Sequence, residues 1–516
     1  MRRKPPAFAT SIRWQSVNVV SQVLLQLVFI MLLARLISKA DFGVMSIALV
    51  VVGFIEIFAQ IGIGPSLIQR KNLQPENIRA AFHFSLALGG VFFAMMYVAA
   101  PWVGAWFNSD TLTEVLRWIA FSFILSSIAL VPRSLLIRQM QFKRLFLAAL
   151  FSMALGNLGI GLGLAYAGYG IWAYVGALLS QNALLGLAYW IIRPDGSRQI
   201  WGAWSWPDLR SMLVYGGKST VFNWLNYTST KVDTLIVGEF NQSHAASTGG
   251  WSSTGVYDRS AHLMSLPITI LGKLGDSVLF SGMSALQSDA KALNRVLVRG
   301  LGLIAWVIFP GSLALAWFST EVAVILLGEE YIEAGSVVRV LFLGVGFRSL
   351  IKLADAVVRA TDRLVPAIAI KSLYLIGLSG SAWWTMQQGF GIEGVAWAVT
   401  GCTLLQFVVY FSWMTPALKL PWSTFFRSIA PGLSGLILAA PGYWVIGSFG
   451  FEWIDQDGTL VAWALGVQVA LVVCWSILVW TILAMRNPAV LDGGDEELRT
   501  KWTAYLPKWS QKLIRK

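Results

Sequence analysis

Long apolar stretches separated by short polar breaks run through almost the whole chain. An α-helix rises 1.5 Å per residue, so about 20 apolar residues cross the ~30 Å hydrocarbon core of a bilayer. About fourteen stretches reach this length. The pattern therefore predicts an all-α, polytopic membrane protein, with spans at residues 13–37, 42–69, 79–106, 113–137, 144–167, 169–192, 211–239, 254–286, 293–318, 333–359, 365–388, 391–415, 424–449 and 459–485.

Composition agrees with a membrane protein and excludes several other classes. Of 516 residues, 56% are hydrophobic and only 13% are charged, whereas soluble domains carry about 25% charged residues. The net charge of +13 would suggest a nucleic-acid partner in a soluble protein, but here the Lys and Arg residues collect in loops, so we expect no nucleic acid. Cys402, Cys474 and three scattered histidines give no metal-ligand spacing. We expect neither a metal nor a cofactor.

Loop charges predict the orientation of the chain. If Arg2, Arg3 and Lys4 lie in the cytoplasm, every later cytoplasmic loop is basic and the outside loops are acidic, with Lys39 as their only basic residue. Because one missed span would invert this alternation, the positive-inside rule favours an even number of spans with both termini cytoplasmic.

The longest loop, which contains WGAWSWP, divides six expected spans from eight. Two segments are weakly similar to each other, LLARLISKADFGVMSIAL and LIVGEF…STGVYDRSAHL. Many transporters are built from internal repeats of this kind. The predicted organisation is an N-terminal lobe at 1–192, a cytoplasmic linker at 193–210, a C-terminal lobe at 211–415, two extra helices within 416–485, and a cytoplasmic tail at 486–516.

One expected span carries a stripe of charge. Arg348, Lys352, Asp355 and Arg359 are spaced i, i+4, i+7 and i+11, which places them on one helix face over ~16 Å. The stripe has a net charge of +2. It is either a cationic wall of a substrate cavity or a set of local salt bridges near the membrane surface.

The seventh and eighth spans hold further charges, which are costly to expose to lipid. Lys218 and Asp233 lie about 60° apart on a helical wheel, so both can face one cavity, whereas Lys231 lies about 140° from Lys218 and is expected to point to another helix. Asp258 and Arg259 follow in the eighth span. Substrate binding and structural pairing both remain open for these groups.

The first lobe contributes two candidates. Arg35 ends the first span, where it either binds substrate or only extends to the membrane surface. Glu56 is the only carboxylate deep in this lobe. It is a candidate proton or sodium site, the alternative being a pair with a group on another helix.

Several segments together resemble the polysaccharide flippases, the Wzx and WzxC-like branch of the superfamily that also contains multidrug extrusion (MATE) transporters and the lipid II flippase MurJ. These segments are RWQSVNVVSQVLLQLVFIMLLARLISKADFGVMSIA, FAQIGIGPSLIQRK, KVDTLIVGEF, TGVYDRSAHLMSLP and FSGMSALQSD. The loop NQSHAASTGGWSST is longer than the family usually has, so the geometry of the periplasmic rim is not carried over.

The resemblance implies two six-helix lobes around a central cavity, in a multi-pass protein of the bacterial inner membrane. The implied activity is the flipping of undecaprenyl-pyrophosphate-linked oligosaccharide to the outer leaflet, without enzymatic chemistry. Membrane lipid and the polysaccharide polymerase or chain-length machinery are the other expected partners. Phosphate pairs well with cations, so the candidate substrate-binding residues are Arg348, Lys352, Arg359, Lys218, Arg35 and Arg259. The candidates for ion coupling or charge pairing are Glu56, Asp233, Asp258 and Asp355.

Two other functions are considered. A MATE-like drug or cation antiporter would favour carboxylates in its cavity, which the excess of cations at 348–359 disfavours. A membrane polymerase or ligase typically needs a large outside loop, and the longest outside loop expected here has about fourteen residues.

Overall fold

The structure is a computed structural model, and it describes residues 8–59, 63–69, 73–193, 206–244, 250–274, 290–361 and 363–448. All regular secondary structure in these ranges is helical. Eight helical stretches in these ranges, two of which run through consecutive helices, are long and apolar enough to cross a membrane. The predicted all-α, polytopic membrane class is therefore confirmed. The last expected span, 459–485, and the tail lie outside the described residues, as does most of the linker.

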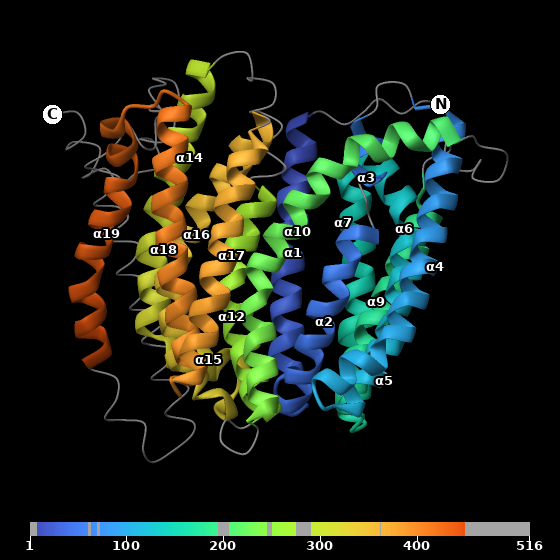
Figure 1. Ribbon diagram of the computed structural model, residues 1–516, viewed down its shortest axis with the longest axis horizontal. Coiled ribbons are helices and arrows are strands. Elements are labelled where there is room, and N and C mark those ends of the chain that lie inside the picture. The colour runs from blue at the N-terminus through green and yellow to red at the C-terminus, as the bar shows by residue number, and fades with distance from the viewer. Residues whose placement is uncertain are drawn as a thin grey trace. The chain divides into compact units, whose positions relative to one another are not determined.

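The described helices follow one another with few intervening residues (Figure 1). The first half contains α1 (Phe8–Leu33), α2 (Lys39–Ala59), α3 (Ile63–Gln69), α4 (Pro75–Trp106), α5 (Asp110–Ile119), α6 (Phe121–Arg138), α7 (Phe142–Ser152), the π-helix η1 (Met153–Gly161), α8 (Leu162–Tyr166) and α9 (Ile171–Ile191). The second half contains α10 (Trp206–Ser243), α12 (Gly250–Leu274), α14 (Ala290–Trp317), α15 (Ser319–Leu327), the 3₁₀ turn η4 (Glu329–Tyr331), α16 (Ala334–Ala360), α17 (Leu364–Gln387), α18 (Gly391–Ala417) and α19 (Trp422–Ser448).

Proline has different effects at different positions in these helices. The expected span 42–69 consists of α2 and α3, and Pro65 lies in the first turn of α3. Proline is tolerated there because the first backbone N–H groups of a helix have no partner within it. Pro267 and Pro310 instead lie inside α12 and α14, which continue through them, as membrane helices often do.

The expected span 144–167 differs from a regular helix, because η1 separates α7 from α8. This stretch is rich in glycine, and Gly156 lies against α9: a Cβ atom at Gly156 would come within 2.7 Å of the backbone nitrogen of Gln181. The close approach requires glycine. Wide π turns of this kind occur frequently at functional sites.

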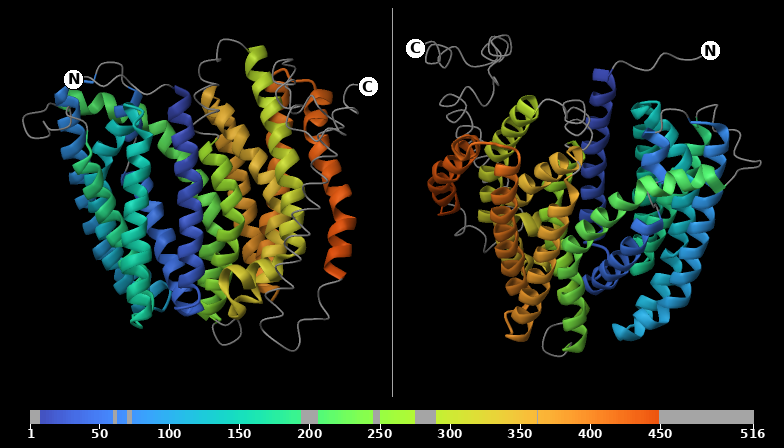
Figure 2. Two further views of the ribbon diagram at one scale, coloured as in Figure 1. Left: turned by 180° about the vertical axis from the view of Figure 1, so that it is seen from behind. Right: turned by 45° about the horizontal axis from the view of Figure 1, so that its top comes forward.

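The chain forms two compact units, which are described separately. The first unit comprises 1–259, 326–331 and 371–395. In it, α4 packs on α5 and α6, α6 packs on α9, and α9 packs on η1; α4, α6 and α9 lie side by side in each view (Figures 1 and 2). A core around Met45, Leu112 and Phe123 holds α2, α5 and α6 together.

The second unit comprises 260–325, 332–370 and 396–516. In it, α14 packs on both α16 and α19. The ring of Phe347 contacts Phe309 at a centroid distance of 5.3 Å and Phe407 at 5.2 Å. These aromatic contacts hold α16 between α14 and α18.

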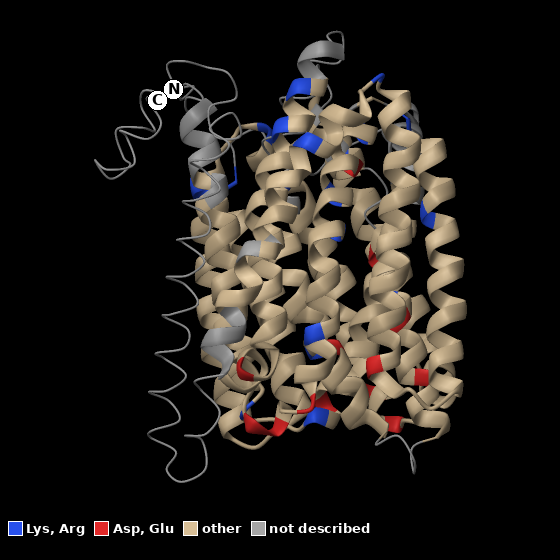
Figure 3. Cartoon of the chain, turned by 90° about the vertical axis from the view of Figure 1, so that its left-hand side faces the viewer, with Lys and Arg blue, Asp and Glu red and all other residues tan. Residues whose placement is uncertain are grey.

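The outer surfaces of the helices suit lipid acyl chains. Trp102 on α4 is 72% exposed and Ile437 on α19 is 76% exposed, which water-facing helices rarely show in such density. Most Lys and Arg residues of the described helices lie toward one helix end, and most Asp and Glu residues toward the other (Figure 3). The long apolar helices and their apolar outer surfaces together identify a multi-pass membrane protein.

Candidate functional site

The charged stripe of α16 contains a buried carboxylate that is hydrogen-bonded to a neighbouring helix. Asp355 is buried, and its Oδ1 accepts a hydrogen bond of 2.9 Å from the Tyr410 hydroxyl on α18. Arg359 is half-buried, and its Nε donates to the backbone carbonyl of Asp355 at 3.3 Å. The Tyr410 bond ties this end of the stripe to α18, whereas the Arg359 bond stays within α16.

Arg348 and Lys352 lie further along the same face, and both are half-buried. Within the described ranges, Arg348 makes neither a hydrogen bond nor an ion pair. Its guanidinium keeps its positive charge at any physiological pH and can bind a phosphate through two parallel hydrogen bonds. Arg348 is thus a half-buried cation whose hydrogen-bonding groups are available to an anionic ligand.

A buried ionic network joins α10, α12 and α2 in the first unit. Asp258 pairs with the adjacent Arg259 and also lies 3.5 Å from the Nζ of Lys231. Asp258 and Arg259 are each only 3% exposed. The guanidinium of Arg259 also lies over the ring of Phe42 on α2, 4.6 Å from its centroid. The wheel-based expectation that Lys231 points to another helix is confirmed, because its partner is on α12.

Asp233 takes part in a second link between α10 and α12. Its side chain is buried and accepts a hydrogen bond of 2.8 Å from the Tyr257 hydroxyl. It accepts another, also 2.8 Å, from the backbone N–H of Thr234. The Tyr257 bond links α12 to α10, and the Thr234 N–H satisfies the other carboxylate oxygen.

The short turn η4 adds a further contact at the start of α2. The Nζ of Lys39 donates to the backbone carbonyl of Glu330 at 2.8 Å and lies 5.9 Å from the centre of the Tyr331 ring. Tyr331 is fully buried, and this burial raises the pKa of its phenol. The side chain therefore stays neutral beside the buried Arg259.

Two of the remaining candidates belong to the first unit, and the side chain of the third cannot be placed. Glu56 is half-buried, and its Oε1 accepts a 3.4 Å hydrogen bond from the Ser126 hydroxyl on α6. Arg35 is exposed, and its Nη1 donates to the backbone carbonyl of Met31 at 3.3 Å. Lys218 belongs to α10, but its side chain lies outside the described part of the chain.

The structure identifies one buried cation that the charge-based sequence reasoning does not select. Lys371 on α17 is only 3% exposed. Its Nζ donates to Oδ1 of Asn226 on α10 at 3.1 Å and lies 5.3 Å from the centre of the Phe222 ring. The sequence does contain a signal for it, because Lys371 is the one charged residue within the expected span 365–388.

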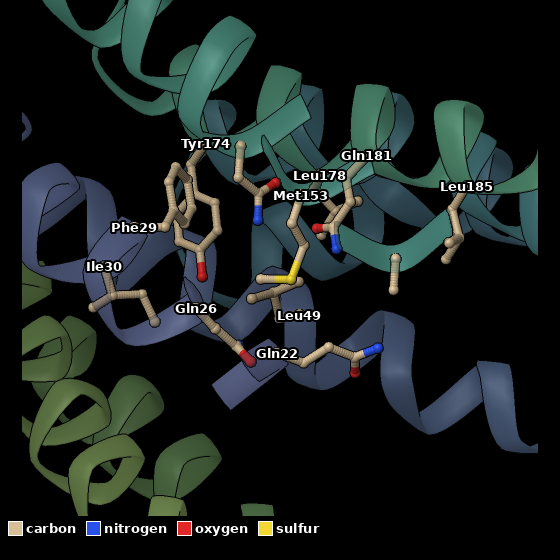
Figure 4. A pocket seen from close by; sticks show the side chains of 12 residues that line it. Gln22, Gln26, Phe29, Ile30, Leu49, Met153, Tyr174, Leu178, Gln181 and Leu185 are labelled. Atoms are coloured by element: carbon tan, nitrogen blue, oxygen red, sulfur yellow. The ribbon is translucent and has the colours of Figure 1, made fainter. Parts of the chain in front are cut away.

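A cavity of about 320 Å³ lies inside the first unit, between α1, α2, α7, η1 and α9. Figure 4 shows the side chains of Gln26, Gln181 and Tyr174 converging on it from α1 and α9, with Met153 of η1 between them. None of the residues that line it is charged, and none is among the candidates chosen from the sequence. Sequence reasoning missed this pocket because amides in apolar helices carry no charge to mark them.

Across the described ranges, no group of three His, Cys, Asp or Glu side chains comes together as a metal site would require. Cys402 is half-buried on α18, and Cys474 lies outside these ranges. The polar groups inside the described helices are cations, carboxylates, amides and hydroxyls, which suit the binding of a polar solute.

Solved structures with the same fold are transporters. The chain matches the lipid II flippase MurJ in an inward closed conformation with a TM-score of 0.66 and 12% identity, over 91% of this chain and 98% of that one. It matches an inward-facing multidrug resistance MATE family transporter of the MOP superfamily with a TM-score of 0.61 and 16% identity, over 78% of this chain and 99% of that one. At these identities the likeness establishes the fold alone.

Sequence relatives come from polysaccharide biosynthesis. The teichuronic acid biosynthesis protein TuaB of Bacillus subtilis (strain 168) is 23% identical over 83% of this chain and 86% of its own length. The lipopolysaccharide biosynthesis protein WzxC of Escherichia coli (strain K12) is 21% identical over 62% of this chain and 63% of its own length. A family model described as polysaccharide biosynthesis protein matches residues 32–336, more than half of the chain. The chain is therefore a member of the polysaccharide biosynthesis protein family.

Proposed function

We propose that the protein flips an oligosaccharide repeat unit linked to undecaprenyl pyrophosphate across the bacterial inner membrane, for the synthesis of a surface polysaccharide. Membership of the polysaccharide biosynthesis family and a fold like that of the flippase MurJ support transport of this kind. The observation that carries the proposal is the half-buried cationic face of α16, on which Arg348 has no partner in the described part of the chain.

The chemistry of the substrate explains why cations are needed inside the membrane. A sugar-pyrophosphate head group is large, polar and anionic, so moving it through hydrocarbon without compensation is prohibitively costly. Guanidinium and ammonium groups fixed in a membrane helix replace part of its hydration, and Arg binds phosphate in a bidentate way. The prenyl tail needs no such site, because it remains dissolved in the lipid.

The proposed mechanism is alternating access, in which the head-group site opens first to the cytoplasm and then to the outside. Arg348, Lys352 and Arg359 form the cationic wall of that cavity, and Lys218 is proposed to face the same substrate. Asp258 is proposed to hold α12 to α10 through Lys231 and to compensate the charge of Arg259, which lies against Phe42 of α2. Glu56 is proposed as the site for a coupling proton or sodium ion.

The proposed topology places both termini in the cytoplasm, with lobes at 1–192 and 211–415. The separation of basic and acidic helix ends supports this orientation (Figure 3), since cytoplasmic ends are enriched in Lys and Arg. A polysaccharide polymerase or its chain-length machinery on the outer side would receive the flipped unit.

Deletion of the gene tests the proposed function. We expect the strain to lose its surface polysaccharide and to accumulate the corresponding lipid-linked repeat unit in the inner leaflet, because synthesis continues while translocation stops. Mass spectrometry of extracted lipids measures the intermediate, and complementation with the wild-type gene should remove it. A strain that makes normal polysaccharide, accumulates no intermediate and becomes drug-sensitive would instead indicate an extrusion transporter.

The double substitution Arg348→Gln and Lys352→Gln tests the cationic wall. We expect polysaccharide export to fall roughly 10- to 100-fold, the loss that corresponds to one charge-assisted hydrogen bond to the head group. Export is measured in the complemented deletion strain, with the amount of membrane protein determined by immunoblot.

The matched control is Arg339→Gln, which removes an exposed arginine from the same helix and should leave export unchanged. Normal export by the double variant at normal protein levels would remove these two cations from the mechanism.

A further inference from the structure

We propose that the cavity inside the first unit is a binding site for an uncharged sugar residue. We call this cavity the amide pocket. Its polar wall consists of Gln22 and Gln26 on α1, Asn157 on η1, and Tyr174 and Gln181 on α9. Its volume of about 320 Å³ lies at the lower end of the range for small-molecule sites. It can accept a single sugar ring but not a whole repeat unit.

Asn157 shows that the pocket is prepared for a ligand. Its side chain is 6% exposed, and within the described ranges its Oδ1 accepts no hydrogen bond. An amide oxygen buried without a donor is destabilising, and such groups in native proteins usually serve a purpose. A hydroxyl or acetamido N–H group in the pocket would supply the missing donor.

The fold fixes Asn157 and Gln181 beside each other. Gly156, which precedes Asn157, lies so close to α9 that a Cβ atom would come within 2.7 Å of the Gln181 backbone. The Ser180 hydroxyl also donates to the backbone carbonyl of Gly156 at 3.3 Å. The two amides therefore stand on backbones that are in direct contact, so the binding groups are positioned before the ligand arrives.

The chemistry of the wall selects the ligand class. No lining residue is charged, so neither a cation nor a phosphate would find a countercharge, and burying an ion without one is costly. Carboxamides both donate and accept hydrogen bonds, as sugar hydroxyls do. The rings of Phe29 and Tyr174, 6.1 Å apart, offer apolar surface to the C–H face of a sugar ring (Figure 4). These features together favour a neutral polyhydroxylated ligand.

The source of the sugar rests on the proposed function: one residue of the lipid-linked repeat unit would occupy the pocket during transport. The amide pocket then recognises the uncharged sugar, while the cations of α16 compensate the pyrophosphate. Binding by the pocket can be measured without transport, so the two proposals can fail separately.

The test uses the purified full-length protein in lipid nanodiscs and saturation-transfer NMR with glucose, galactose and N-acetylglucosamine as probes. We expect the wild type to bind at least one of these sugars. Asn157→Leu and Gln181→Leu should weaken binding about tenfold or more, because each removes hydrogen bonds from a desolvated site. Gln406→Leu, which removes a buried amide from α18, is the matched control and should bind like the wild type.

Size-exclusion profiles and thermal melting verify that each variant is folded, and Asn157→Ala replaces a leucine variant that fails this check. The proposal is overturned if the wild type binds none of the probes, or if the pocket variants bind as well as the wild type. It is also overturned if sodium ions bind to the wild type and lose binding in Asn157→Leu, which would identify a cation site. If the pocket variants lose sugar binding but the deletion strain accumulates no lipid-linked intermediate, the amide pocket is supported as a sugar site and the proposed flippase function is contradicted.

Discussion

Replacement of Asp258 by alanine is expected to lower the free energy of unfolding by about 3–5 kcal/mol, the usual cost of removing one partner from a buried ion pair. The substitution leaves Arg259 buried with its charge uncompensated and takes the partner from Lys231. The cation–π contact with Phe42 remains, but such a contact contributes only ~0.5–2 kcal/mol. Unfolding in mixed micelles, titrated with SDS, measures the change.

Glu76→Ala is the matched control for this experiment. Glu76 forms an ion pair with Arg79 one turn along α4, at 3.7 Å, and its side chain is 49% exposed. A solvent-exposed pair of this kind contributes about 0–1 kcal/mol. If Asp258→Ala destabilises the protein no more than Glu76→Ala, the network is hydrated and does not hold α10 to α12.

Gly255→Val should prevent normal packing of α12 on α2. A Cβ atom at Gly255 would overlap the backbone carbonyl of Lys39, and one at Gly43 would overlap that of Trp251. Because the obstacles are backbone atoms, no side-chain rotation relieves the overlap. We expect the free energy of unfolding to fall by at least about 3 kcal/mol, the upper end for overpacked sites. The change would be seen as a loss of monodisperse protein and as unfolding at a lower SDS concentration.

Gly377→Val on α17 provides the comparison, because a Cβ atom at Gly377 meets nothing within 4 Å. The same change from glycine to valine there adds apolar surface without a clash, so the variant should remain folded. Equal stability of the two variants would show that α2 and α12 can move apart without loss of folding free energy, so that their contact at Gly43 and Gly255 is not fixed.

The close contact between Gly43 on α2 and Gly255 on α12 also gives a physical meaning to the weak similarity between the two sequence segments. Gly43 and Gly255 both precede valine in the two similar segments, DFGVMSIA and STGVYDRSA. The structure brings these positions together, because a Cβ atom at Gly255 would lie 3.0 Å from the backbone nitrogen of Gly43. Small residues that allow helix backbones to touch are a general feature of membrane helix packing. Corresponding positions of the two segments thus meet each other in the fold.

The sequence by itself determined the membrane class, the family and the position of most described helices. Hydrophobic length depends only on local composition, so α16, α17 and α18 lie close to the expected spans 333–359, 365–388 and 391–415. It also determined which charges share the face of α16, since helical periodicity is a property of the helix alone.

Only the tertiary structure decided which group each charge contacts. Lys231 and Asp258 belong to different helices, and Lys371 meets Asn226 across 145 positions of the chain. The amide pocket and η1 likewise depend on the contact of Gly156 with α9. Hydropathy reports how costly a residue is in lipid, but the compensating partner comes from a helix distant in the sequence, and its identity follows from how the helices pack.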